Sequence, residues 1–97
     1  MIKEVIDKSM RMRIAKEVLL DLPEWFGIEE YTQEYIENSG NLPFFAAYDD
    51  NSIVGFISLK ETSEFTIEIY CMGVLKKYHN TGFGKKLFDS AKAYSNE

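Results

Sequence analysis

The segment that decides the fold is residues 73–88, GVLKKYHNTGFGKKLF. A short apolar run ends there at Val74, and glycines at positions 82 and 84 open a pattern typical of a helix. The first N–H groups of a helix lack partners within it, and the helix macrodipole adds roughly half a positive charge at that end. Glycine lets the backbone approach an anion closely because it has no Cβ. The segment therefore favours an anion-binding turn between a strand and a helix.

The local charge supports this interpretation. Residues 76–86 contain four lysines, the only histidine of the chain and no carboxylate, although the chain has 16 acidic residues and a net charge of −5. A phosphate-bearing ligand would favour such a reversal of charge. The alternative is an ordinary strand-to-helix turn with solvated lysines, since the spacing matches neither a Walker loop nor the dinucleotide fingerprint. The residue chemistry alone leaves both interpretations open.

Length and composition narrow the remaining classes of protein. The chain has 97 residues, of which 45% are hydrophobic and 28% charged, and this balance is typical of a single globular domain. Its negative charge argues against nucleic-acid binding. No apolar run is long enough to cross a bilayer and the N-terminus lacks a signal-peptide pattern, so no membrane partner is expected. A single cysteine forms no internal disulfide, which predicts a reducing, cytoplasmic setting.

Hydrophobic periodicity predicts a mixed α/β fold. From about Ser9, an apolar stripe with a spacing of four residues predicts an amphipathic helix that ends before Pro23. The stripe consists of Met10, Ile14, Val18 and Leu22. A second short helix is expected to end at the NSGN turn, and a third to run from Gly84 onward. Strands are expected over residues 1–6, 43–50, 53–61 and 64–75, the middle two as a hairpin. The predicted order is β-α-α-β-β-β-α, with a mostly antiparallel sheet.

The register of Val74, His79, Gly82 and Gly84 resembles the acetyl-CoA motif of the GNAT superfamily of N-acetyltransferases. That motif is a strand ending in Val, then Gln/Arg-x-x-Gly-x-Gly/Ala, then a helix. The chain departs from it only where His79 replaces the usual Gln or Arg, and backbone N–H groups perform most of the pyrophosphate binding in this superfamily. The order of elements also resembles the N-terminal part of the acyl-CoA N-acyltransferase fold, so residues 1–97 would form one partial GNAT domain.

The resemblance implies acetyl-CoA as cofactor and direct transfer of its acetyl group to a primary amine. The pantetheine arm would pair with the backbone at the end of the strand, at Met72 and Val74. The pyrophosphate would bind the loop and the helix start, which are formed by His79, Asn80, Thr81, Gly82, Phe83, Gly84 and Lys85. No residue is assigned to a metal.

Glu68 is the candidate general base. Its neighbours in FTIEIYC are largely apolar, and burial disfavours the charged form of a carboxylate, which suits it to accept a proton near neutrality. Its position also resembles that of the catalytic glutamate in histone-acetylating members of the superfamily. The alternatives are a solvent-facing glutamate or one paired with a lysine on a neighbouring strand. Cys71 is interpreted as a small buried residue rather than a nucleophile.

The amine acceptor, a small molecule or a peptide, is expected near aromatic residues. The superfamily lines its acceptor pocket between the two N-terminal helices, which implies Trp25, Phe26 and Tyr31 here. Tyr70 joins this set because it shares a strand face with Glu68. A role for these aromatic residues in the core is the alternative.

Members of the superfamily continue after the motif helix with a fifth strand and a segment that often supplies a tyrosine acid. This chain stops at AKAYSNE, so the strand at 64–75 is expected to have an open edge that invites association into a homo-oligomer. Three hypotheses follow: a truncated family member, a dimer that covers the edge, or a non-catalytic acyl-CoA-binding or protein-interaction module.

Overall fold

The computed structural model describes residues 1–22, 29–63 and 66–95 and has the predicted order of elements. The strands are β1 (Ile2–Glu4), β2 (Phe44–Asp49), β3 (Ser52–Ser63) and β4 (Thr66–Val74). The helices are α1 (Lys8–Leu20), α3 (Glu29–Ser39), the 3₁₀ turn η1 (Lys76–Tyr78) and α4 (Phe83–Ser95). The mixed α/β class is confirmed, and none of the helices in the described ranges has the length and apolarity that a bilayer crossing requires.

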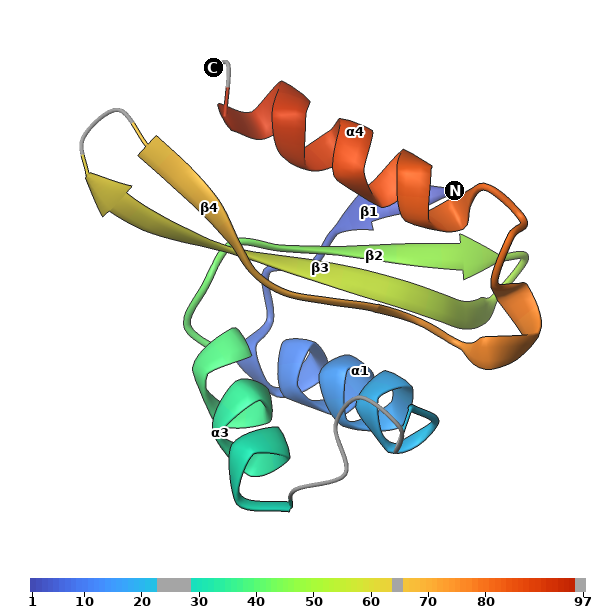
Figure 1. Ribbon diagram of the computed structural model, residues 1–97, viewed down its shortest axis with the longest axis horizontal. Helices are drawn as coiled ribbons and strands as arrows, with labels where there is room; N and C mark the ends of the chain where they lie inside the picture. Colours follow the sequence, from blue (N-terminus) through green and yellow to red (C-terminus); the bar gives the residue numbers. More distant parts are fainter. Residues whose placement is uncertain (23–28, 64–65, 96–97) are drawn as a thin grey trace.

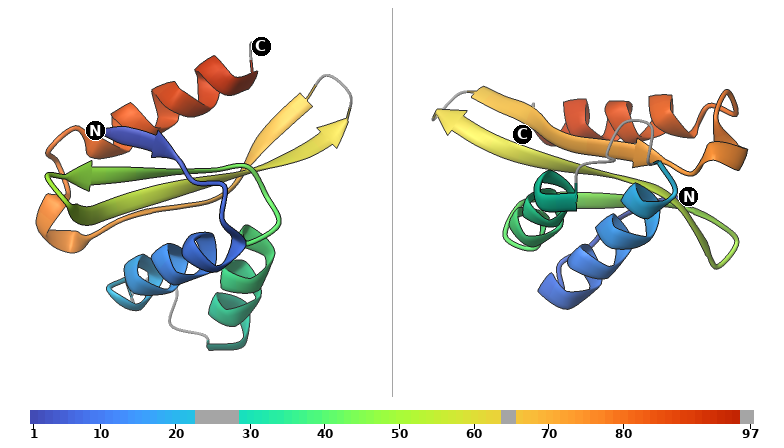
Figure 2. Two further views of the ribbon diagram at one scale, coloured as in Figure 1. Left: turned by 180° about the vertical axis from the view of Figure 1, so that it is seen from behind. Right: turned by 60° about the horizontal axis from the view of Figure 1, so that its bottom comes forward.

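The strands form one antiparallel sheet in the order β1-β2-β3-β4. Helix α4 covers one face of this sheet, and α1 and α3 cover the other (Figure 1). The views in Figure 2 agree with this three-layer arrangement. Within the described residues, β4 pairs on one side only, with β3, so it forms an edge of the sheet. The described part of the chain therefore has the predicted open edge.

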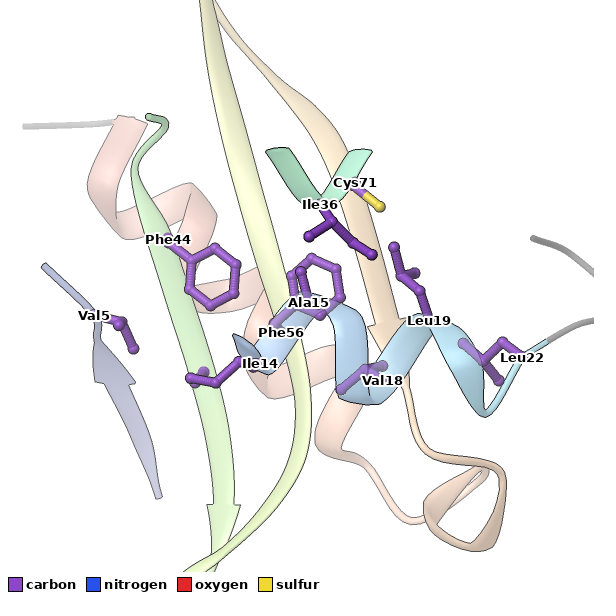
Figure 3. Packing of buried hydrophobic residues seen from close by; sticks show 11 residues of the cluster. Val5, Ile14, Ala15, Val18, Leu19, Leu22, Ile36, Phe44, Phe56 and Cys71 are labelled. Carbon is purple, nitrogen blue, oxygen red and sulfur yellow. The ribbon is translucent and has the colours of Figure 1, made fainter. Parts of the chain in front are cut away.

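Helix α1 packs the predicted apolar stripe against the sheet. Its N-cap is Asp7, whose Oδ2 accepts a hydrogen bond of 2.9 Å from the backbone N–H of Met10. The stripe itself is fully buried at Ile14, Val18 and Leu19, and Figure 3 shows these side chains between the helix and the strands. Met10, which the stripe included, is 40% exposed, so contact with the sheet begins about one turn later than predicted.

Arg11 and Gly40 fasten the first strand and the two N-terminal helices together. Arg11 donates from Nε to the carbonyl of Val5 (2.6 Å) and from its guanidinium to the carbonyl of Gly40 (3.3 Å). A Cβ on Gly40 would lie 2.9 Å from Cγ of Met12, so glycine lets the end of α3 approach α1. The pair of helices is thereby held as one layer under the sheet.

The hairpin of β2 and β3 carries the centre of the core. Phe44 and Phe56 stack with their ring centroids 5.1 Å apart and an interplanar angle of 4°, and both are fully buried on the α1 side (Figure 3). On the opposite face, Leu87 and Ala91 of α4 pack on a second buried cluster that includes Val54. Both faces of the central hairpin are therefore covered, as its long apolar run requires.

A β-bulge in β4 decides which residues face which side. Ser58 and Leu59 are consecutive on β3, but their partners on β4 are Cys71 and Ile69. Tyr70 lies between these two partners and is therefore an extra residue. The Ser58 hydroxyl donates to the Cys71 carbonyl (3.3 Å) at this interruption of the ladder. Tyr70 and Cys71 consequently both pack on the α1 and α3 side, whereas Met72 packs on the α4 side.

Candidate functional site

The connection from β4 to α4 has the geometry that the sequence predicted. The turn η1 follows β4, with the N–H of Tyr78 donating to the carbonyl of Leu75 (2.9 Å). Asn80 and Gly82 then adopt left-handed backbone angles, with φ of 65° and 90°. No atom lies within 4 Å of an added Cβ on Gly82, so glycine is favoured there by its backbone angle rather than by crowding.

The N-terminus of α4 presents a row of backbone donors at this turn. The N–H of Lys86 donates to the carbonyl of Gly82 (3.1 Å), which is the first hydrogen bond of the helix. The N–H groups of residues 83–85 precede that bond and point out of the helix end. The macrodipole makes this end positive, and the exposed side chains of Lys85 and Lys86 add to the charge. The turn can therefore bind an anionic group such as a phosphate.

A cavity of about 610 Å³ opens beside this turn and continues along the end of β4. Its described lining comes from β4, η1, the loop after η1, the start of α4 and the segment after α1. These residues are Leu22, Met72, Gly73, Val74, Tyr78, His79, Asn80 and Gly84. Leu22 and Gly73 pack on the α1 side of the sheet, whereas Val74 and Gly84 lie on the α4 side. The cavity thus wraps around the open edge of β4.

Register places polar backbone groups of β4 on this open edge. The N–H of Leu75 donates to the carbonyl of Val54 on β3 (2.8 Å). In an antiparallel pair, the residues opposite each other alternate between inward-facing and outward-facing backbone groups. The N–H and C=O groups of Val74, and those of Met72 two residues earlier, therefore point away from β3 towards the edge. An extended ligand with amide groups could pair with them as another strand would.

Contacts with the hairpin and with α1 brace the loop. The Tyr78 hydroxyl donates to Oδ2 of Asp49 (3.1 Å), and this hydrogen bond raises the pKa of Tyr78. The Tyr78 ring also meets Phe83 edge-on, with centroids 5.6 Å apart. On the other side, Oδ2 of Asp21, the C-cap of α1, accepts from the N–H of Lys76 at 2.7 Å. The loop is thus fixed to two parts of the chain that are remote in sequence.

The residues predicted to bind the cofactor do not all line the cavity. Five of them do, namely Met72, Val74, His79, Asn80 and Gly84. The remaining four lie on the same loop or at the helix start, outside the lining, namely Thr81, Gly82, Phe83 and Lys85. Sequence reasoning missed Leu22, Gly73 and Tyr78. For Leu22, the available signal was its position at the end of the apolar stripe of α1.

Glu68 is placed differently from what its apolar neighbours suggested. Its side chain is exposed, so the expectation of a buried carboxylate is wrong. It stands opposite Lys60 in the register of β3 and β4. Among the described residues, Glu68 is not one of those that line the cavity. The cause is the position of β4 at the sheet edge, because α1, on the face that Glu68 shares with Tyr70, does not reach this end of the strand (Figure 1).

The predicted acceptor residues are dispersed. Tyr70 is half-buried, its hydroxyl accepts a hydrogen bond from Nδ2 of Asn38 (2.9 Å), and its ring meets Tyr35 edge-on at 5.4 Å. Tyr31 is on α3 and is 60% exposed. Trp25 and Phe26 lie outside the described residues. Alternation along β4 puts Tyr70 and Glu68 on the same face.

Cys71 is a buried thiol at the bulge. Only 5% of it is exposed, and burial raises its pKa to about 12, an effect that the N–H of Met72 partly opposes. A thiol in this state contains almost no thiolate near neutrality and is a poor nucleophile. Its placement agrees with the interpretation of Cys71 as a small core residue.

Known proteins that resemble this chain point to one family. The model of the acetyltransferase (GNAT) family matches residues 11–97. A curated Bacillus velezensis protein, named an uncharacterized N-acetyltransferase, is 30% identical over 77 residues, which are 69% of this chain and 48% of that protein. Among solved structures, aminoglycoside 6′-acetyltransferase type Ii superposes with a TM-score of 0.77 at 22% identity, over 99% of this chain and 64% of that one.

A third relative was solved with coenzyme A. The PaiA N-acetyltransferase from Thermoplasma acidophilum superposes with a TM-score of 0.71 at 21% identity, over 99% of this chain and 72% of that one. The chain spans about half the length of the curated relative that it matches. The solved structures show the shared fold, and the family model covers most of the chain. This protein therefore belongs to the acetyltransferase (GNAT) family.

Proposed function

We propose that this chain binds acetyl-CoA around the open end of β4 and serves an N-acetyltransferase that transfers the acetyl group to a primary amine. One observation carries the proposal. The donor-rich N-terminus of α4 and the outward-facing backbone groups of β4 meet at a single cavity of about 610 Å³. An anionic diphosphate and an amide-containing arm, joined in one molecule, match these two features.

The fit can be assigned residue by residue. The pyrophosphate would bind the N–H groups of residues 83–85, where Gly82 has the left-handed backbone that the turn requires. Gly84 lies in the first turn of α4, where the lack of a Cβ lets a phosphate approach the backbone. The pantetheine arm would extend along Met72 and Val74 and pair with their edge groups. His79, Asn80, Thr81 and Phe83 shape the loop, and Lys85 adds positive charge at the helix start.

The proposed chemistry is direct attack by the amine. Acetyl-CoA, when bound, supplies a thioester carbonyl that a neutral amine can attack. A C–N bond forms, the C–S bond breaks, the amine loses a proton and the departing sulfur takes one up. We assign the first proton transfer to the Glu68 carboxylate, acting through water because Glu68 is exposed and lies outside the cavity lining.

The proposed acceptor is a small-molecule or peptide amine bound on the α3 side of β4. Glu68 and Tyr70 share that face, and Tyr31 lies on α3, whose Tyr35 and Asn38 contact Tyr70. Aminoglycoside acetyltransferases are among the structural neighbours, which supports a cationic amine as one class to test. The reducing cytoplasm is the proposed setting, since the single cysteine is a free thiol.

Ligand binding tests the first half of the proposal. The melting temperature of the purified chain should rise with acetyl-CoA at concentrations above its dissociation constant. Calorimetric titration with CoA should give one site per chain. A melting temperature unmoved by millimolar acetyl-CoA would remove both the enzyme and the cofactor-binding hypotheses.

Substitution at Glu68 tests the second half. With an acceptor found by screening polyamines, aminoglycosides and peptides for thiol release, Glu68→Gln should lower kcat by about 10²-fold or more, the usual contribution of a general base. Glu61→Gln, an equal charge change on the exposed end of β3, is the matched control and should leave kcat unchanged. Full activity in Glu68→Gln would exclude the assignment. CoA binding without transfer to any amine would favour the non-catalytic module.

We also propose that a second copy of the chain covers the first part of the β4 edge, around Ile69, and leaves the end at Met72 and Val74 to the pantetheine arm. Unpaired strand edges favour association, and Ile69 on β4 and Phe88 on α4 are 43% and 44% exposed. Sedimentation should show a concentration-dependent dimer, both with and without acetyl-CoA. A monomer at all concentrations would contradict this part and leave cofactor binding untouched.

A further inference from the structure

The imidazole of His79 lies on the open side of β4. Val74 and Leu75 share one peptide unit, whose N–H donates to Val54 on β3 (2.8 Å). The carbonyl of the same unit is the Val74 carbonyl, and it points the opposite way, towards the edge. Nε2 of His79 lies 2.7 Å from that oxygen, in a partly buried contact. The ring therefore contacts one of the edge groups that the proposed pantetheine arm would use.

The backbone of His79 is fixed as well as its ring. Its N–H donates to the carbonyl of Lys76 (3.1 Å), which closes η1. The left-handed residues Asn80 and Gly82 follow directly and lead into α4. His79 is thus the point at which the loop leaves the strand, and it is held there by both main chain and side chain.

We propose that His79 is a positioning residue for acetyl-CoA, which uses its Nε2–H to fix the loop against the Val74 carbonyl. This inference rests on the proposed function. One CoA molecule must reach both the N–H groups of residues 83–85 and the edge of β4, so the separation of these two sites has to stay constant. A carbonyl oxygen has two lone pairs, and the histidine contact leaves the second for the ligand.

The contact has a chemical requirement that can be measured. The Val74 oxygen is only an acceptor, so Nε2 must carry a proton. The neutral Nε2–H tautomer and the imidazolium meet this condition, and the Nδ1–H tautomer does not. A glutamine at this position, the usual residue of the motif, carries an N–H donor at the end of a side chain of similar reach. Leucine has a similar volume and no donor.

Two variants and two ligands test the role in binding. His79→Leu should weaken CoA roughly tenfold, the upper effect of losing one hydrogen bond. The same variant should weaken the binding of ADP, which has the diphosphate without the pantetheine arm, by less than about twofold. ADP would bind only at the helix start, so its affinity does not depend on the distance between the helix start and the β4 edge. His79→Gln should recover most of the CoA affinity. Unchanged CoA affinity in His79→Leu, or equal losses for both ligands, would overturn the positioning role alone.

The wild-type chain provides a second test that does not depend on a variant folding. His79 is the only histidine, so its ring nitrogens can be assigned directly from long-range ¹H–¹⁵N correlations. We expect the single ring proton of the neutral imidazole to lie on Nε2. A proton on Nδ1 would overturn the inference whatever the variants do. A wild-type chain that binds neither CoA nor ADP would instead overturn the proposed function and, with it, this role.

Discussion

The closed core and the open edge of β4 are built by different means. On the α1 and α3 side, side chains such as Ile14, Val18 and Phe56 are fully buried and make a closed core. Around the open edge of β4, the candidate site is made mainly from half-buried side chains and from backbone groups of a strand edge and a helix end. The stability of the closed core depends on side-chain volume, whereas binding at the open edge depends on backbone geometry. Substitutions should therefore separate stability from binding.

The largest effect is expected in the closed core. Phe56→Ala removes a ring that is fully buried and stacked on Phe44. Loss of buried area and the cavity left behind should lower the free energy of unfolding by about 3–5 kcal/mol. Urea unfolding followed by circular dichroism measures it. Lys60→Ala, at an exposed position of the same strand, should change the free energy of unfolding by less than about 0.5 kcal/mol. Similar values for both variants would contradict the closed-core description.

The second effect should fall on binding. Gly82→Val forces a β-branched residue to φ of 90° where nothing else is crowded, so backbone strain of about 1–3 kcal/mol is the whole cost. We expect CoA affinity to fall at least tenfold because the turn shifts. Gly84→Ala is the comparison, since its Cβ would make an ordinary contact at 3.4 Å. Calorimetry on both variants should show the larger loss at position 82, and the reverse order would refute the turn assignment.

A smaller effect should connect the two regions. Asp21→Ala removes the acceptor for the N–H of Lys76 and should cost about 1 kcal/mol of stability. Asp21→Asn keeps an acceptor oxygen and should cost less than half as much. The free energy of unfolding from urea titration, with CoA affinity measured in parallel, checks both. Equal losses in the two variants would mean that charge, not the hydrogen bond, matters at this position.

The smallest effect concerns pH. Burial raises the pKa of Cys71 from an ordinary value of 9.0 to about 12. The unfolded chain therefore releases this proton at lower pH than the folded one, so the stabilisation is complete well below pH 9 and is lost as pH rises towards 12. The Cys71 thiol should therefore make the free energy of unfolding roughly 0.4 kcal/mol lower at pH 9 than at pH 7. Cys71→Ala should remove that difference, and an unchanged pH slope would contradict it.

The order of elements could be predicted because each element has its own local signal. The spacing of Ile14 and Val18 indicated a helix, and β-branched and aromatic runs indicated strands. The turn between β4 and α4 was equally visible, because Gly82 reveals a backbone requirement directly. The left-handed angle at Gly82 is a conformation that this residue type accepts and others resist.

The rest depended on contacts between distant parts of the chain. The burial expected for Glu68 failed because apolar neighbours along a strand do not reveal which stretch of that strand the helices cover. The bulge at Tyr70 has no signature in the sequence, since it arises from the pairing of two strands. The same reason explains why Leu22 was missed, because only the packed sheet brings it beside Gly73.

The hydrogen bond between Asp21 and Lys76 has a consequence for the time course of folding. It joins positions 55 residues apart, and closing so long a loop costs more chain entropy than forming the short β2–β3 hairpin. Such a contact is expected to form after the main barrier has been crossed. Its loss would then speed unfolding and leave the folding rate nearly unchanged, which would move one arm of a chevron plot and not the other. The bracing of the loop would thereby set how long the folded protein persists, rather than how fast it forms.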